Sequence, residues 1–83
     1  MILFFIEVTD VYGGEANYSW VTRHAIRAKS RLGAIQRFSR MSGLNWRNVG
    51  CDRYDSKSGA TCLFIDEYDE DLHGRHQLNT DER

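Results

Sequence analysis

The stretch that decides the fold is "YSWVTRHAIRAKSRLGAIQRFSRMSG", residues 18 to 43, in which the spacing of the apolar residues changes partway along. As far as Ala28, residues alternate between two faces, as in a strand with one buried side. From Ser30 onward, apolar residues recur at helical spacing until Gly43. Serine is a favoured N-cap, and glycine is a favoured C-terminal stop. The stretch therefore predicts a strand that leads directly into a short helix.

The same spacing assigns side chains to faces. On the strand, every second residue from Tyr18 to Ala28 shares one face, whereas Arg23 and Arg27 share the other. The helix is amphipathic, and its wet side is basic. The helix residues expected to pack on the sheet are Leu32, Ala34, Ile35, Phe38 and Met41, and those expected to face water are Gly33, Gln36, Arg37 and Arg40.

Segments on either side of this stretch complete an α+β fold. Residues 2–9 predict a first strand, followed by a glycine-containing loop at 11–17. Residues 49–54 and 60–68 predict a hairpin around the turn formers at 55–59. The predicted order is β-β-α-β-β, an antiparallel sheet with one amphipathic helix packed on one face.

The length of the chain permits one domain with a modest core. We place that domain at residues 1–72. Residues 73–83 are polar and show no apolar period, so they predict a C-terminal tail that is dispensable for folding. The apolar start, Met1–Ile6, is too short for a membrane span and lacks a basic leader. We therefore expect a cytoplasmic protein with no membrane partner.

The two cysteines indicate neither a disulfide framework nor a zinc site. If residues 55–58 form the hairpin loop, Tyr54 lies opposite Gly59 and Cys51 lies opposite Cys62. We expect both cysteines to be reduced and to act as small buried hydrophobes.

Charge is divided sharply along the chain. Residues 16–51 contain seven Lys or Arg residues and no acid, which gives a sum of +7. Residues 66–83 contain seven acids against Arg75 and Arg83, which gives −5. The formal net charge of −1 therefore conceals two opposite poles.

No residue pattern predicts catalysis or a cofactor. His73 and His76 have the spacing H-x-x-H, but they lie in the most polar stretch and do not predict a metal site. His24 alternates with apolar residues and is interpreted as a hydrogen-bonded core or rim histidine rather than a general base. We expect a protein that is not an enzyme, and a small enzyme of unknown reaction is the second alternative, after a nucleic-acid-binding module.

Three hypotheses account for the basic pole. The favoured one is a binding surface for a protein partner, because Arg, Trp and Tyr are enriched at interface hot spots. The second is a nucleic-acid-binding module, in which arginines hold phosphates and aromatic rings stack on bases. The third is neutralisation of the basic face by the acidic tail, or plain solvation of both. The residues predicted to meet a partner are Arg31, Arg37, Arg40, Trp46 and Arg47.

A resemblance adds a class of function. The succession YGGEANYSWV at 12–21, AKS at 28–30, GLNWR at 43–47 and YDSKSGATC at 54–62 resembles small uncharacterised proteins of tailed bacteriophages. It covers roughly residues 5–68. That family has no assigned catalytic residues, so none are carried over. The resemblance implies a protein that engages or inhibits a host protein or a protein–nucleic acid complex, for example as an anti-CRISPR inhibitor or in host takeover.

Overall fold

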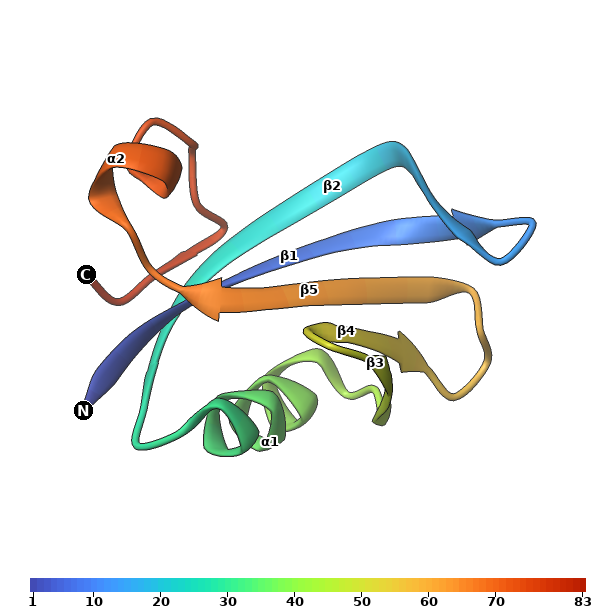
Figure 1. The fold of residues 1–83 in the computed structure, drawn as a ribbon, viewed down its shortest axis with the longest axis horizontal. Coiled ribbons are helices and arrows are strands. Elements are labelled where there is room, and N and C mark those ends of the chain that lie inside the picture. Colours follow the sequence, from blue (N-terminus) through green and yellow to red (C-terminus); the bar gives the residue numbers. More distant parts are fainter.

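The strand at the start of the chain pairs with the strand that ends at Ala28. Together they form a long antiparallel hairpin at the centre of the sheet (Figure 1). A computed structural model describes residues 1–83 and contains one six-stranded sheet in the order β3-β4-β5-β1-β2-β6. The elements are β1 (Ile2–Tyr12), β2 (Glu15–Ala28), α1 (Arg31–Ser42), β3 (Trp46–Gly50), β4 (Arg53–Ser56), β5 (Thr61–Glu67), α2 (Glu70–His73) and β6 (Thr80–Asp81).

The first hairpin is longer than the sequence predicted. Its turn is only Gly13 and Gly14, with φ of 63° and 82°, a region that glycine enters without steric cost. The expected loop at 11–17 is therefore mostly strand. Near this end the pairing of β1 with β2 changes register between Thr9 and Val11. Beyond that irregularity the ladder continues in one register to Ala28.

The helix α1 confirms the predicted boundaries. The hydroxyl of Ser30 accepts a hydrogen bond from the Gly33 N–H at 3.0 Å, and Gly43 ends the helix with φ of 73°. α1 covers one face of the sheet (Figure 1). Neither helix of the structure is long and apolar enough to cross a membrane.

The core lies between α1 and the central strands. Its members alternate along β1, β2 and β5, as strands with one buried face require. They are Phe4, Ile6, Val8, Ile26, Ala28, Ala34, Ile35, Phe38, Leu63 and Ile65, with Trp46 and Tyr54 packed at the margin.

Two residues expected to pack on the sheet do not. Leu32 is 60% exposed and Met41 is 47% exposed. Leu32 lies on the flank of α1 away from Ala34 and Phe38, so the buried stripe is narrower than predicted. Met41 is on the correct side, but it lies in the last turn of α1, at the mouth of a cleft.

The second half of the sheet differs from the prediction. The strand expected at 49–54 is two strands, because Gly50 and Cys51 have positive φ and turn the chain back. Tyr54 lies opposite Leu63 rather than Gly59, and Cys62 lies opposite Asp55. Cys51 is exposed in the turn and Cys62 is buried, so the predicted cysteine pair is wrong. The predicted loop at 55–58 is wrong because β4 continues to Ser56 and β5 begins at Thr61, so the loop lies at 57–60.

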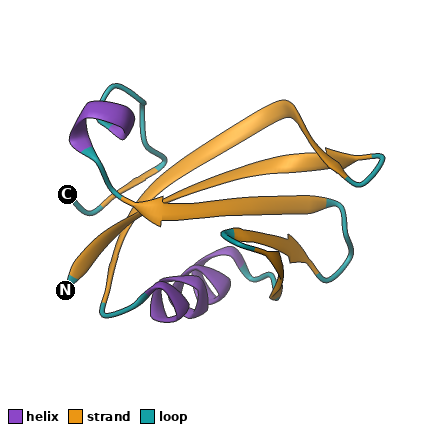
Figure 2. Ribbon diagram, in the orientation of Figure 1, coloured by secondary structure: helices purple, strands orange, loops and turns teal.

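The C-terminal segment returns to the sheet instead of leaving as a free tail. β6 pairs with β2 in parallel, with Thr80 opposite His24, so the sheet is mixed rather than purely antiparallel. The ring of His73 stacks on Phe5 at a centroid distance of 4.1 Å, on the face opposite α1. Figure 2 shows the two helices on opposite sides of the sheet. The fold therefore has six strands and a second short helix, where four strands and one helix were expected.

Candidate binding site

Two of the predicted partner-binding arginines are engaged within the chain. The Arg37 guanidinium forms a two-pronged ion pair with the Glu82 carboxylate and also donates to the Arg27 carbonyl at 2.8 Å. Arg31 donates to Asp52 at 2.8 Å and to the Ile65 carbonyl at 3.1 Å. Acidic groups 21 and 45 residues away in the sequence thus neutralise this part of the basic helix face. Glu82 belongs to the acidic C-terminal segment that the third hypothesis named, whereas Asp52 does not.

The other predicted residues form a group at the sheet edge. The side chains of Arg40 and Arg47 are exposed and make no hydrogen bond or ion pair within the chain, and Lys57 lies on the same side as Arg47. Trp46 lies between them, because it lines one depression with Arg40 and another with Arg47 and Lys57. We call Arg40, Trp46, Arg47 and Lys57 the cationic edge.

Trp46 is held in place by its neighbours. Its indole N–H donates to the Ser42 hydroxyl at 3.2 Å, and its ring centroid is 6.0 Å from that of Phe38. The last turn of α1 therefore orients the first residue of β3. A half-buried, fixed aromatic ring between free cations has the composition of an interface anchor.

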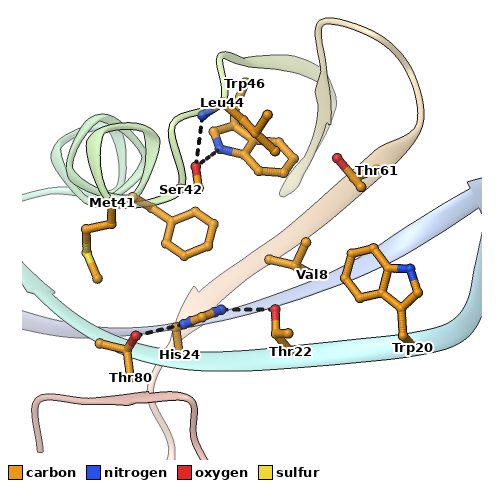
Figure 3. Close-up of a pocket in the computed structure, with 11 residues that line it drawn as sticks. Val8, Trp20, Thr22, His24, Met41, Ser42, Leu44, Trp46, Thr61 and Thr80 are labelled. Carbon is orange, nitrogen blue, oxygen red and sulfur yellow. Dashed lines mark hydrogen bonds between the residues drawn. The ribbon is translucent and has the colours of Figure 1, made fainter.

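A cleft that sequence reasoning did not identify lies beside Trp46 (Figure 3). It has a volume of about 260 Å³ and opens between the end of α1, the start of β3 and the strands β1, β2 and β5. Both tryptophans of the chain line it. The full lining is Val8, Trp20, Thr22, His24, Phe38, Met41, Ser42, Leu44, Trp46, Thr61 and Thr80. One feature of the sequence could have indicated this cleft. Trp20 lies on the same face of β2 as the core residues, but it precedes the part of β2 that α1 covers.

The irregular pairing of β1 with β2 positions Trp20. The Thr9 hydroxyl donates to the Trp20 carbonyl at 2.9 Å and accepts from the Tyr18 N–H at 2.9 Å. The Asp10 carboxylate accepts from the Ser19 N–H at 2.9 Å, and hydrogen bonds to Ser19 and Asn17 hold the pKa of Asp10 far below its ordinary value. Tyr18 adopts φ of 56°, which is uncommon for a bulky residue. These bonds fix the backbone that carries one wall of the cleft.

His24 forms the floor of the cleft and is hydrogen-bonded on both sides of its ring. Its Nδ1 is 3.0 Å from the Thr80 hydroxyl and its Nε2 is 3.0 Å from the Thr22 hydroxyl (Figure 3). Burial lowers the pKa of His24 from its ordinary 6.5. The imidazole is therefore neutral at pH 7, which agrees with the interpretation as a hydrogen-bonded core histidine.

Acidification is expected to destabilise the protein through His24. The unfolded chain binds this proton more readily than the folded one, so stability is complete above the unfolded pKa of 6.5 and falls as the pH decreases below it. The measurement is the melting temperature at about pH 7.5 and about pH 5.5, above and below that pKa. In His24→Gln, the difference between these two temperatures should shrink. If the melting temperature changed equally with pH in the natural protein and in His24→Gln, His24 would not be the cause of the acid destabilisation.

Thr61 contributes a hydroxyl with no partner to the same cleft. Its Oγ1 is the one buried side-chain oxygen or nitrogen that makes no hydrogen bond in the structure. The side chain comes from the start of β5 and is directed into the cleft (Figure 3). Most buried polar groups in proteins are satisfied, so this unpaired oxygen, which has less than 1 Å² of exposed surface, is an exception within the wall of the cleft.

Other groups with reactive side chains are not brought together. His73 and His76 lie near Phe5, with ring centroids 4.1 and 6.1 Å from it, and no cluster of three His, Cys, Asp or Glu residues is arranged to hold a metal ion. Burial raises the pKa of the Cys62 thiol, which favours its protonated form. A second depression, between Phe5, Glu7 and Asp66, is acidic.

Comparisons with known proteins return no relative. No family model matches the sequence, and no match is found among curated proteins or solved structures.

Proposed function

We propose that the protein is a non-enzymatic binding protein that engages a host protein or protein complex, as a phage inhibitor of host defence or an agent of host takeover would. Anti-CRISPR inhibition is one form of this function. The proposal draws its class from the resemblance to small tailed-bacteriophage proteins and its site from the geometry. The contact surface is the cationic edge together with the adjoining cleft.

One observation carries the proposal. Arg40 and Arg47 have no acidic partner within the chain, and they flank a fixed, half-buried Trp46. The apolar surface continues from Trp46 into the cleft, where Trp20, Met41 and Leu44 are exposed. Exposed apolar groups gathered beside unpaired cations are typical of a surface that binds an acidic protein partner.

Ion pairs within the chain weaken the hypothesis that the basic surface binds nucleic acid. Of the seven cations in residues 16–51, Arg23, Arg31 and Arg37 form ion pairs with acids of the same chain. A face that binds phosphates needs several free cations, because each phosphate contact adds to affinity and to its salt dependence. On the cationic edge three cations are unpaired, namely Arg40, Arg47 and Lys57.

Charge reversal tests the proposed surface. We expect Arg40→Glu to weaken binding to the captured partner by about 2 kcal/mol, roughly 30-fold in Kd, and Arg47→Glu to weaken it less. The control is Arg75→Glu, which makes the same charge change at an exposed arginine outside the cationic edge and should leave Kd nearly unchanged. The partner is obtained by affinity capture from nuclease-treated host lysate and then titrated in purified form.

A parallel titration separates protein from nucleic acid. The same variants are titrated with mixed-sequence DNA and RNA at several salt concentrations. Phosphate binding would lower affinity in even steps at each arginine and reduce the salt slope by about 0.7 to 0.9 per lost contact. Micromolar binding of nucleic acid at physiological salt, lost in this pattern, would replace the protein partner with the second hypothesis.

A further inference from the structure

We infer that the bound protein adds an extended acidic segment to the open edge of β3, as a further strand of the sheet. The source of this segment, a host protein, rests on the proposed function. Its conformation and charge rest on the backbone of β3 and on the unpaired cations beside it.

The outer side of β3 has unpaired backbone groups. β3 ends the sheet, and β4 is its only neighbour. The Asn45 carbonyl accepts from the Lys57 N–H at 3.1 Å, and these two residues continue the register of β3 with β4. Their backbone groups therefore point at each other. Since hydrogen-bonded and non-bonded pairs alternate along an antiparallel ladder, the N–H and C=O groups of Trp46 and Asn48 point away from β4.

The bonds between β4 and β5 lead to the same assignment. The Asp52 carbonyl accepts from the Ile65 N–H at 3.0 Å, in continuation of the register of β4 with β5. By alternation, Tyr54 also directs its backbone toward β5, and so away from Asn48, which lies opposite it on β3. The N–H and C=O groups of Asn48 and Trp46 thus form an open template for another strand.

The other side of the sheet is a poorer template. β6 already covers part of β2. In the uncovered part of β2 the pairing with β1 changes register between Thr9 and Val11, and Tyr18 has φ of 56°. Irregular backbone of this kind protects an edge from further pairing. β3, in contrast, keeps one register with β4 from Trp46 to Asn48.

Charge selects an acidic segment. β3 carries Arg47 and no acid. Arg47 lies opposite Asp55, but the Asp55 carboxylate accepts from the Arg53 guanidinium at 3.0 Å. Arg40 and Lys57 bring further positive charge to the cationic edge. Opposite charges on neighbouring strands stabilise the pairing and like charges destabilise it, so a strand with Asp or Glu fits better than a second copy of β3.

The two faces of the sheet determine the pattern of the added strand. Side chains alternate between the faces along a strand. Trp46 packs beside Phe38 on the face that α1 covers, so Arg47 lies on the opposite face. The added strand therefore has apolar side chains on the face of Trp46 and acidic side chains on the face of Arg47. This pattern is an acidic residue at every second position with apolar residues between.

The test uses a capped peptide in which glutamate alternates with valine. Amide hydrogen exchange, followed for each residue by NMR, reports the backbone bonds directly. In the free protein, the N–H groups of Trp46 and Asn48 should exchange faster than that of Arg47, which points toward β4. Saturation with the peptide should slow exchange at Trp46 and Asn48 by about 10-fold or more. The Gly13 amide, in the distant turn between β1 and β2, should not change.

Two variants at Asn48 separate the backbone from the side chain. Asn48→Pro removes the outward N–H without removing a bond to β4, at a position where an edge strand tolerates proline. We expect it to weaken peptide binding by about 10-fold or more, because a hydrogen bond is lost and the ring hinders close approach. Asn48→Ala is the matched control. It also loses the side-chain bonds to the Cys51 and Arg53 carbonyls, but it keeps the N–H and should bind the peptide normally.

Further probes separate charge from backbone pairing. Arg47→Glu should weaken the glutamate peptide by about 2- to 10-fold and should favour a peptide in which lysine replaces glutamate. A glutamate peptide that is N-methylated at every residue keeps the charge but has no N–H to donate. It should not bind, and this result serves if Asn48→Pro does not fold.

Each outcome bears on a separate claim. No binding of the glutamate peptide, equal binding of the lysine peptide, or fast exchange at Trp46 and Asn48 in the bound state would overturn the inference. Protection of these amides that grows with protein concentration alone would assign the edge to a second copy. If strand addition failed while Arg40→Glu still weakened the captured partner, the proposed function would stand. If the peptide behaved as expected while no host protein depended on Arg40, the proposed function would fail and the strand-binding edge would remain.

Discussion

Replacing Phe38 with alanine is expected to lower the free energy of unfolding by about 3 to 5 kcal/mol. Phe38 is 4% exposed and belongs to the core between α1 and the sheet. Its ring also contacts the rings of His24 and Trp46, with centroids 4.7 and 6.0 Å away. Truncation therefore opens a cavity that rigid neighbours on two strands cannot close.

The loss at Phe38 is large relative to the whole stability of such a domain, which is typically about 5 to 15 kcal/mol. Urea denaturation followed by circular dichroism measures it. Gln36→Ala is the matched control, because Gln36 is exposed on the other side of α1 and should change stability by less than about 0.5 kcal/mol. A loss below about 1 kcal/mol for Phe38→Ala would contradict the observed packing of the helix.

Deleting residues 73–83 is expected to cost about 3 kcal/mol and to lower the melting temperature by about 10 °C or more. This reverses the expectation from sequence that the tail is dispensable. His73 and His76 cover Phe5, which is 6% exposed, so truncation returns an aromatic ring to water. The deletion also removes the backbone bonds from Asn79 and Glu82 to β2, which are 2.7 and 3.1 Å long.

A single substitution separates the contributions of the tail. Glu82→Gln removes the ion pair with Arg37 but keeps the strand pairing, and we expect a loss below about 1 kcal/mol because the pair is partly exposed. Differential scanning calorimetry of the three proteins measures both effects. A truncated chain that melts within about 2 °C of the full one would show that the docked segment adds nothing to stability and that the domain is complete at 1–72.

The same variants bear on the cationic edge. Freed of Glu82, Arg37 would join Arg40 on the wet side of α1 and enlarge the basic surface. Binding to an acidic partner is then expected to strengthen in Glu82→Gln and to weaken at higher salt. The C-terminal segment thus neutralises Arg37 and reduces the positive charge on the wet side of α1.

Local features of the sequence determined α1 and the central hairpin. The N-cap at Ser30, the stop at Gly43 and the change from alternating to helical spacing act over a few residues, so they can be recognised without knowing the rest of the chain. The core face of β2 near Ile26 followed from the same alternation. The sequence also identified Arg40, Trp46 and Arg47 as surface candidates.

The tertiary structure alone decided the pairings between distant segments. The register of Tyr54 against Leu63, the docking of β6 on β2 and the neutralisation of Arg37 by Glu82 join residues whose sequence spacing carries no local signal. The cleft has the same origin, because Trp20 and Trp46 become its walls only when α1 folds the chain across the sheet. Hydrogen-bond caps and periodicity act between near neighbours, whereas register and docking depend on which arrangement buries the most apolar surface over the whole chain.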